Sequence, residues 1–226
     1  MSSEPRLGLW MGLAVAITRP LSHLLTKRRW EGQQHIPRRG GVILAANHLS
    51  WADPFTLGHF VYKAGRIPRF MAKESLFRAP VIGRVVRGAN QIPVHRGTPD
   101  RTALQAGLRV ITGGGDIGLF PEGTRGTGQL TAIQHGIGYL ALQGKCPVVP
   151  VVCQGTAAAL PKGKKLPRWR APIDVIFGPA FTVEVDGDPR ARSTIAAAAE
   201  QVRLGLLAHL QAVSGTAPGA DERRSA

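Results

Sequence analysis

The chain has few acidic residues, only two cysteines and no long apolar run. Asp and Glu number 14 against 29 Lys and Arg among 226 residues, which gives a formal net charge of +15. A surplus of this size favours a negatively charged partner: nucleic acid, anionic lipid or a phosphorylated small molecule. No stretch approaches the roughly 20 apolar residues that a membrane-spanning helix needs, so the sequence predicts no transmembrane helix.

The two cysteines do not form an obvious disulfide pair. Cys146 and Cys153 flank the run PVVPVV. If this run is one strand, the two residues lie roughly 23 Å apart at about 3.3 Å per residue, which is too far for a disulfide bond. We therefore expect both thiols to be reduced and buried, and the missing disulfide favours a cytosolic compartment.

Several enzyme signatures are also missing. No serine lies in a GxSxG turn, and neither cysteine lies in a polar, electropositive loop, so no protein nucleophile is expected. The sequence has no HExxH motif and no paired cysteine ligands. We therefore expect no metal site and no cofactor.

The positive charge leaves a nucleic-acid-binding protein open as an alternative. However, aromatic residues make up only 6% of the chain. We find no basic helix with interleaved aromatics and no recognised RNA- or DNA-binding module, so no nucleic-acid partner is expected. A basic membrane-binding module without catalysis is a second alternative.

The N-terminal residues 1–31 differ from the rest of the chain. The apolar run LGLWMGLAVAI is interrupted at Arg19 and Pro20 and is followed by LSHLLTKRRW. We interpret residues 7–29 as one or two amphipathic, basic helices that lie on a membrane surface. A signal peptide and an ordinary core-packing helix are the alternatives for this segment.

From residue 32 onward, strand-like and helix-like patterns alternate. Apolar strand-like runs lie at 41–46, 69–76, 91–97, 116–120, 146–155 and 173–181, and helix-like runs at 55–65, 80–89, 101–114, 135–145 and 191–213. This alternation predicts an α/β domain over 32–213, with a largely parallel or mixed central sheet flanked by helices. We expect residues 214–226 to form a disordered tail.

The stretch NHLSWADP, residues 47–54, directly follows the first of these strands. Asp53 followed by Pro54 is typical of a capped helix start, so residues 49–52 form a turn that allows His48 and Asp53 to meet. A carboxylate beside an imidazole fixes its tautomer and equips it as a general base. In the plainer alternative, Asp53 only caps the helix and His48 is a solvated loop residue. Without a protein nucleophile, such a base would activate a substrate hydroxyl.

A second unusual stretch, FPEGTR, follows the strand at 116–120. It offers Glu122, Gly123, Thr124 and Arg125, and the arginine can grip a phosphate with two hydrogen bonds. No Walker lysine follows, so this is not a nucleotide-binding P-loop. The alternative is a surface turn with a solvated Glu-Arg pair. Lys73 and Arg96 end two other strands, and together with Arg125 they would make an anion pocket beside His48.

The four stretches NHLSWAD, IPVHRG, FPEGTR and VPV occur in this order between about Gly41 and Gly155. In order and separation they resemble the four motif blocks of the lysophospholipid acyltransferase family, and most closely the bacterial 1-acylglycerol-3-phosphate acyltransferases. HxxxxD alone is a weak signal, but its combination with FPEGTR is specific. The second block departs from the common pattern because His95 precedes Arg96.

The resemblance implies a reaction and a set of roles. His48 would deprotonate the free hydroxyl of lysophosphatidate, which attacks an acyl-CoA or acyl-carrier-protein thioester and gives phosphatidate, while Asp53 orients the imidazole. Another lysophospholipid or a glycolipid is the alternative acceptor. By the same resemblance, Lys73, Arg96 and Arg125 would bind the phosphate, Glu122, Gly123 and Thr124 would shape the loop, and Val149, Pro150 and Val151 would line the acyl or donor side. The protein would work at the cytoplasmic face of the cell membrane, held peripherally or at the interface.

Overall fold

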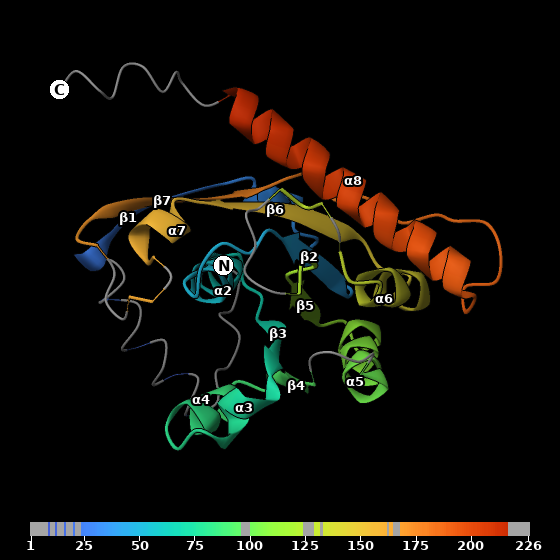
Figure 1. The fold of residues 1–226 in the computed structure, drawn as a ribbon, viewed down its shortest axis with the longest axis horizontal. Coiled ribbons are helices and arrows are strands. Elements are labelled where there is room, and N and C mark those ends of the chain that lie inside the picture. The colour runs from blue at the N-terminus through green and yellow to red at the C-terminus, as the bar shows by residue number, and fades with distance from the viewer. Residues whose placement is uncertain are drawn as a thin grey trace.

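A seven-stranded mixed sheet forms the centre of the computed structural model, which describes residues 24–95, 100–123, 129–131, 133–161, 163–164 and 168–216, together with residues 9, 12, 16 and 20. The strand order is β1-β7-β6-β2-β5-β3-β4 (Figure 1). The strands are β1 Thr26–Glu31, β2 Val42–Ala46, β3 Pro68–Lys73, β4 Ile92–Val94, β5 Asp116–Leu119, β6 Val148–Gln154 and β7 Ala171–Phe177. The helices are η1 Gln33–His35, α2 Asp53–Lys63, α3 Glu74–Arg78, α4 Ile82–Gly88, α5 Arg101–Thr112, α6 Gly136–Gly144, α7 Thr156–Ala159 and α8 Arg192–Thr216.

Five neighbouring strands of this sheet run in the same direction. β6, β2, β5, β3 and β4 are all parallel to one another, whereas β7 pairs with β6 in the antiparallel sense and β1 lies parallel to β7. The α/β class with a mixed sheet is therefore confirmed. Because five parallel strands end at the same edge, the loops that follow them are brought together there.

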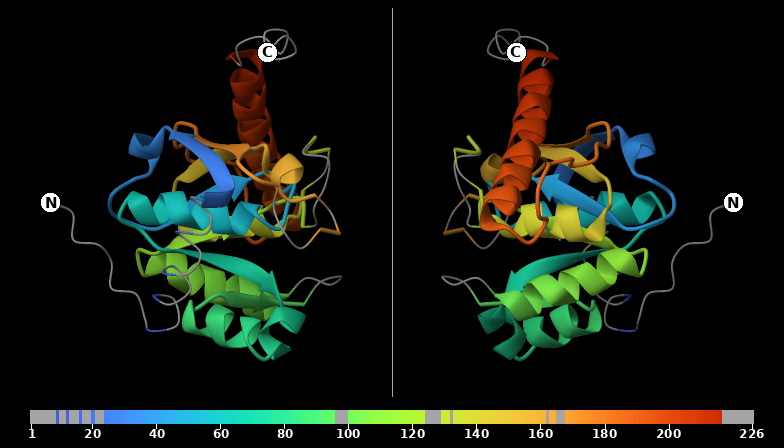
Figure 2. Two further views of the ribbon diagram at one scale, coloured as in Figure 1. Left: turned by 90° about the vertical axis from the view of Figure 1, so that its left-hand side faces the viewer. Right: turned by 90° about the vertical axis from the view of Figure 1, so that its right-hand side faces the viewer.

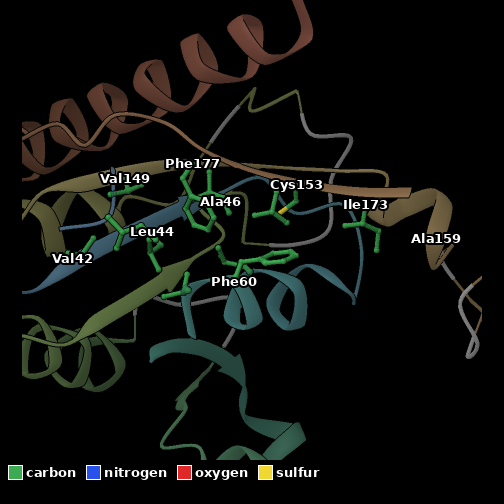
Figure 3. Packing of buried hydrophobic residues seen from close by; sticks show 14 of the residues in the cluster. Val42, Leu44, Ala46, Phe60, Val149, Cys153, Ala159, Ile173 and Phe177 are labelled. Carbon is green, nitrogen blue, oxygen red and sulfur yellow. The ribbon is translucent and has the colours of Figure 1, made fainter. Parts of the chain in front are cut away.

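The central strand β2 separates two apolar cores. All five of its residues are fully buried, and successive side chains alternate between the two faces of the sheet. Val42, Leu44 and Ala46 pack with side chains of α2, whereas Ile43 and Ala45 pack with α5, α6 and α8. Figure 3 shows the first core, with Phe60 of α2 against the sheet. The C-terminal part of α8 extends beyond the sheet (Figures 1 and 2).

The sequence interpretation of residues 26–29 as helix was wrong. Thr26–Glu31 forms β1, which pairs with β7 over six positions from Thr26↔Ala171 to Glu31↔Ile176. Trp30 stacks on Phe60 with 4.9 Å between ring centroids, and Lys63 Nζ lies 4.0 Å from the Trp30 ring centroid. Packing with α2 and pairing with β7 thus override the helical pattern, and the predicted boundary at residue 31 cuts through the domain.

Other boundaries shift less. The described residues 9, 12, 16 and 20 are helical, and the remainder of 1–23 lies outside the described residues. The predicted strand 69–76 ends at Lys73 and gives way to α3. The final helix continues to Thr216, three residues past the predicted end, and residues 217–226 lie outside the described part. None of the described helices combines the length and apolarity that crossing a bilayer requires.

A buried ion pair ties down the opposite, amino end of the parallel strands. Arg66 Nε donates to Asp116 Oδ2 at 2.6 Å, and Nη1 donates to the carbonyl of Pro37 at 2.6 Å. Nη2 donates to Gly40 at 2.6 Å and to Gly114 at 3.1 Å. The Arg66 side chain is 10% exposed and that of Asp116 2%. Burial raises the pKa of Asp116, and the hydrogen bond and charge of Arg66 oppose that rise.

We expect Arg66→Met to lower the free energy of unfolding by about 3–5 kcal/mol, because Asp116 would stay buried without its counter-charge. The remaining carboxyl would then take up a proton more readily in the folded than in the unfolded state. The loss should therefore shrink as the pH falls. Urea unfolding at several pH values measures both effects.

Two controls accompany this measurement. Arg78→Met removes an exposed ion pair with Glu74 and should change stability little. Arg66→Met combined with Asp116→Leu should recover the part of the loss that comes from the unpaired charge, while the carbonyls of Pro37, Gly40 and Gly114 still lose their donor. A single Arg66→Met variant as stable as the wild type would contradict the structural role given to this pair.

Candidate active site

The site lies at the carboxyl edge of the parallel strands. β2 runs into Asn47 and His48, its neighbour β5 runs into Phe120, and β6 runs into Gly155. β2 pairs with both β5 and β6, so the loops that follow the three strands are neighbours. Residues that are far apart in the sequence therefore meet at one point of the sheet.

His48 and Asp53 are in contact, as the sequence predicted. His48 Nδ1 lies 2.9 Å from Asp53 Oδ2. The Asp53 side chain is fully buried and that of His48 is 12% exposed. Because a carboxylate only accepts hydrogen bonds, this contact assigns the imidazole proton to Nδ1 and leaves the lone pair on Nε2. Nε2 is therefore the nitrogen that can act as a base.

Asp53 begins α2, as expected, but it does not cap the helix. The residue at the cap position is Ala52, and no side chain forms a capping hydrogen bond there. The Asp53 carboxylate turns back instead, and its Oδ2 accepts the backbone N–H groups of Leu49 at 2.6 Å and Ser50 at 2.7 Å. The predicted cap was wrong because Asp53 is the first residue of the helix itself, and its Oδ2 faces the amides of the preceding turn.

The loop after β5 contacts both the ring and the backbone of His48. The imidazole stacks on Phe120 with 4.4 Å between ring centroids, and Phe120 in turn stacks on Phe70 at 6.0 Å. Glu122 Oε1 accepts the backbone N–H of His48 at 3.0 Å. Gly123 has a φ of 72°, a left-handed conformation that favours glycine. Glu122 thus contacts the His48 backbone directly, in addition to lying in the loop that the sequence singled out.

Asn47 and Ser50 hold the turn in place, and the sequence analysis gave neither a role. Asn47 Nδ2 donates to the carbonyl of Cys153 at 3.0 Å, and its Oδ1 accepts the N–H of Cys153 at 2.7 Å. Ser50 Oγ donates to the carbonyl of Leu160 at 2.9 Å. The available signal was a polar amide directly after five apolar residues, but its partner lies 106 positions away.

The predicted phosphate-binding residues are only partly described. Arg96, Thr124 and Arg125 lie outside the described residues, so their positions stay predictions. Lys73 ends β3 and lines an open cavity of about 160 Å³ together with Glu74, Ser75, Arg78, Val94 and His95. His95 Nδ1 lies 3.0 Å from Glu74 Oε2. Lys73 thus lies at the predicted edge of the sheet, two strands away from β2.

The predicted acyl-side residues belong to the middle of the sheet. Val149, Pro150 and Val151 pair with Leu44, Ala45 and Ala46 of β2. Val149 and Val151 are fully buried in the core beneath α2, and Figure 3 labels Val149 there. Their part in binding an acyl chain stays a prediction.

The cysteines are poorly suited to act as nucleophiles. Both are free and buried, as predicted. Burial raises the pKa of Cys146 to about 11 and that of Cys153 well above its usual value. Across the described ranges, no group of three or more His, Cys, Asp and Glu side chains is arranged to hold a metal ion.

Comparison with known proteins places these residues in a family. A family model described as Acyltransferase matches residues 27–154, which is more than half of the chain. The 1-acyl-sn-glycerol-3-phosphate acyltransferase of Bacillus subtilis (strain 168) is 31% identical over 137 residues, covering 59% of this chain and 64% of that protein. The enzyme of the same name from Borreliella burgdorferi is 30% identical over 156 residues, covering 67% and 56%.

The fold has a match among solved structures. The crystal structure of the 1-acyl-sn-glycerophosphate (LPA) acyltransferase PlsC from Thermotoga maritima has a TM-score of 0.64 at 24% identity, covering 86% of this chain and 76% of that chain. The matched segments span less than two thirds of the length of the two relatives named above. The family match includes His48, Asp53 and Glu122, and the chain belongs to the acyltransferase family.

Proposed function

We propose that this protein transfers a fatty acyl group from a thioester to the free hydroxyl of lysophosphatidate, giving phosphatidate. The observation that carries the proposal is the 2.9 Å contact between His48 Nδ1 and Asp53 Oδ2 at the carboxyl edge of the sheet. The names of the relatives from Bacillus subtilis and Borreliella burgdorferi support this acceptor. The two buried cysteines favour direct transfer over a route through a protein thioester.

In this mechanism the acceptor hydroxyl gives its proton to His48 Nε2 as its oxygen attacks the carbonyl carbon of the thioester. The tetrahedral intermediate collapses, the carbon–sulfur bond breaks, and the imidazolium returns the proton to the leaving thiolate. Asp53 stabilises the imidazolium, as the carboxylate does in other His-carboxylate pairs. A placed base contributes roughly 10² to 10⁴ in rate, or about 3–5 kcal/mol, so substrate positioning must supply much of the rest.

The remaining predicted residues bind and position the substrates. Lys73, Arg96 and Arg125 supply positive charge for the acceptor phosphate, with Arg125 able to form a two-pronged contact. Val149, Pro150 and Val151 line the acyl or donor side. The donor is an acyl-CoA or acyl-carrier-protein thioester, and the reaction uses no further cofactor. The N-terminal segment holds the protein at the cytoplasmic face of the membrane, where it meets its lipid acceptor.

We expect His48→Ala to reduce acyl transfer to lysophosphatidate by at least about 100-fold, because the base is lost. The assay follows product formation from acyl-CoA and from acyl-carrier protein by mass spectrometry. His135→Ala is a matched control, because His135 is exposed and forms no capping bond at α6. Wild-type turnover by a folded His48→Ala protein would falsify the mechanism.

Glu122 tests how the His48 backbone is held. We expect Glu122→Gln to keep most of the activity, because the amide oxygen can still accept the N–H of His48. Glu122→Ala should lower kcat by up to about tenfold, the equivalent of one lost hydrogen bond. Equal losses in both variants would mean that the charge of Glu122, rather than its acceptor oxygen, is what matters.

The N-terminal segment is tested by deletion of residues 1–23, which leaves β1 intact. We expect this deletion to lower flotation with anionic vesicles, because the apolar residues of the segment would be lost. Circular dichroism and thermal unfolding check that the remaining domain keeps its fold. If a folded deletion variant floated like the full chain, the membrane role of this segment would be wrong.

A further inference from the structure

Three exposed aromatic side chains lie in the segments that follow β2 and β6, the strands whose carboxyl ends meet at the site. Trp51 is 49% exposed, Phe55 65% and Trp169 62%. Large aromatic side chains normally bury most of their surface, and apolar groups gathered on a surface often mark an interaction site. We call Trp51, Phe55 and Trp169 the aromatic patch.

Trp51 and Phe55 flank the start of α2. The first helical hydrogen bond of this region runs from Thr56 N to Ala52 O at 2.9 Å. Trp51 lies in the turn directly before α2 and Phe55 in the first turn of α2, and both side chains are exposed. Both belong to the segment that follows β2, which also carries His48.

Hydrogen bonds bring Trp169 to the same side of the molecule. Ser50 Oγ donates to Leu160 O at 2.9 Å, and Arg168 N donates to Ala159 O at 2.7 Å. The first bond ties the turn before α2 to the end of α7, and the second ties the start of the Trp169 turn to α7. In Figure 2, the β3 arrow points toward the side of the molecule on which α7 lies. This side is the carboxyl edge of the parallel strands, and the same edge carries His48.

The surroundings of Trp169 are strongly basic. Lys164, Arg168 and Arg170 are exposed, and the sequence between Gly155 and Ile173 contains no acidic residue. Aromatic side chains flanked by cations match the chemistry of an anionic bilayer, because the rings suit the interface and the cations attract the headgroups.

We propose that the aromatic patch and its flanking cations form a second membrane-contact surface, separate from the N-terminal segment, which sets the His48 edge against an anionic bilayer. The proposal rests on the proposed function, since a lipid acceptor then reaches Nε2 from the leaflet without crossing bulk water. Another exposed apolar pair, Val81 and Ile82, is 70% and 51% exposed at the start of α4. It lies outside the aromatic patch, which makes it a matched comparison.

Tryptophan fluorescence tests the contact in the full chain. The chain has four tryptophans, and Trp10→Phe with Trp30→Phe leaves only Trp51 and Trp169. Vesicles of phosphatidylglycerol and phosphatidylcholine with brominated acyl chains should quench this emission. If the protein cosedimented with these vesicles and its emission were not quenched, the patch would not touch the bilayer and the proposal would be overturned.

Substitution of the exposed aromatic residues gives an independent test. We expect Phe55→Ala with Trp169→Ala to weaken vesicle binding about tenfold, because two large apolar side chains would no longer move from water into the bilayer. Val81→Ala with Ile82→Ala should leave binding nearly unchanged. Equal binding by the first variant and the wild type, or an equal loss in both variants, would contradict the proposal.

Removal of positive charge distinguishes a bilayer from other partners. Arg168→Ser with Arg170→Ser should weaken binding to anionic vesicles by about 25-fold, roughly fivefold per cation, and leave binding to neutral vesicles unchanged. Tight DNA binding that these substitutions abolish, without vesicle binding by the wild type, would assign the surface to nucleic acid and overturn the proposal.

Activity on a dissolved acceptor distinguishes this proposal from the proposed function. The Phe55→Ala and Trp169→Ala variant should acylate a short-chain lysophosphatidate below its micelle concentration at the wild-type rate, and lose rate only on vesicle-bound acceptor. If the wild type acylated neither acceptor, the proposed function would be wrong, whatever the vesicle-binding measurements show. An equal loss of rate on both acceptors would overturn the membrane-contact role alone.

Discussion

The buried carboxylate of Asp53 is the interaction on which the site depends. One oxygen, Oδ2, accepts hydrogen bonds from the His48 imidazole and from the amides of Leu49 and Ser50. A fully buried carboxylate is stabilised only when such donors surround it. The turn therefore folds around the charge, and the charge in turn fixes the imidazole. The other oxygen, Oδ1, is buried without a hydrogen-bond partner among the described residues.

The two ends of the parallel strands have different tasks. At the amino end, Arg66 joins Asp116 to three backbone carbonyls and locks the loops that enter β2 and β5. At the carboxyl end, the loops carry His48 and Glu122. A well-held amino end lets the opposite loops carry reactive groups without loosening the sheet between them.

Local patterns predicted much of the fold and the central pair of the site. The strands at β2, β5 and β6 were visible as short apolar runs, and the α2 start was visible from Asp53 and Pro54. β1 was missed because its extended conformation depends on pairing with β7, whose residues lie about 145 positions later in the chain. The roles of Asn47 and Ser50 were missed for the same reason, since their partners lie 106 and 110 positions away.

The side chain of Asn47 extends the hydrogen-bonding pattern of the sheet by one residue. Its amide donates and accepts in one plane, just as a peptide group does, and it pairs with both polar groups of Cys153 in the neighbouring strand. The β2–β6 ladder thus continues one step beyond Ala46 while the main chain is already free to turn away. A peptide-like side chain in this place lets the chain leave the sheet one residue early, and that departure is what frees His48 to project from the sheet edge instead of being paired within it.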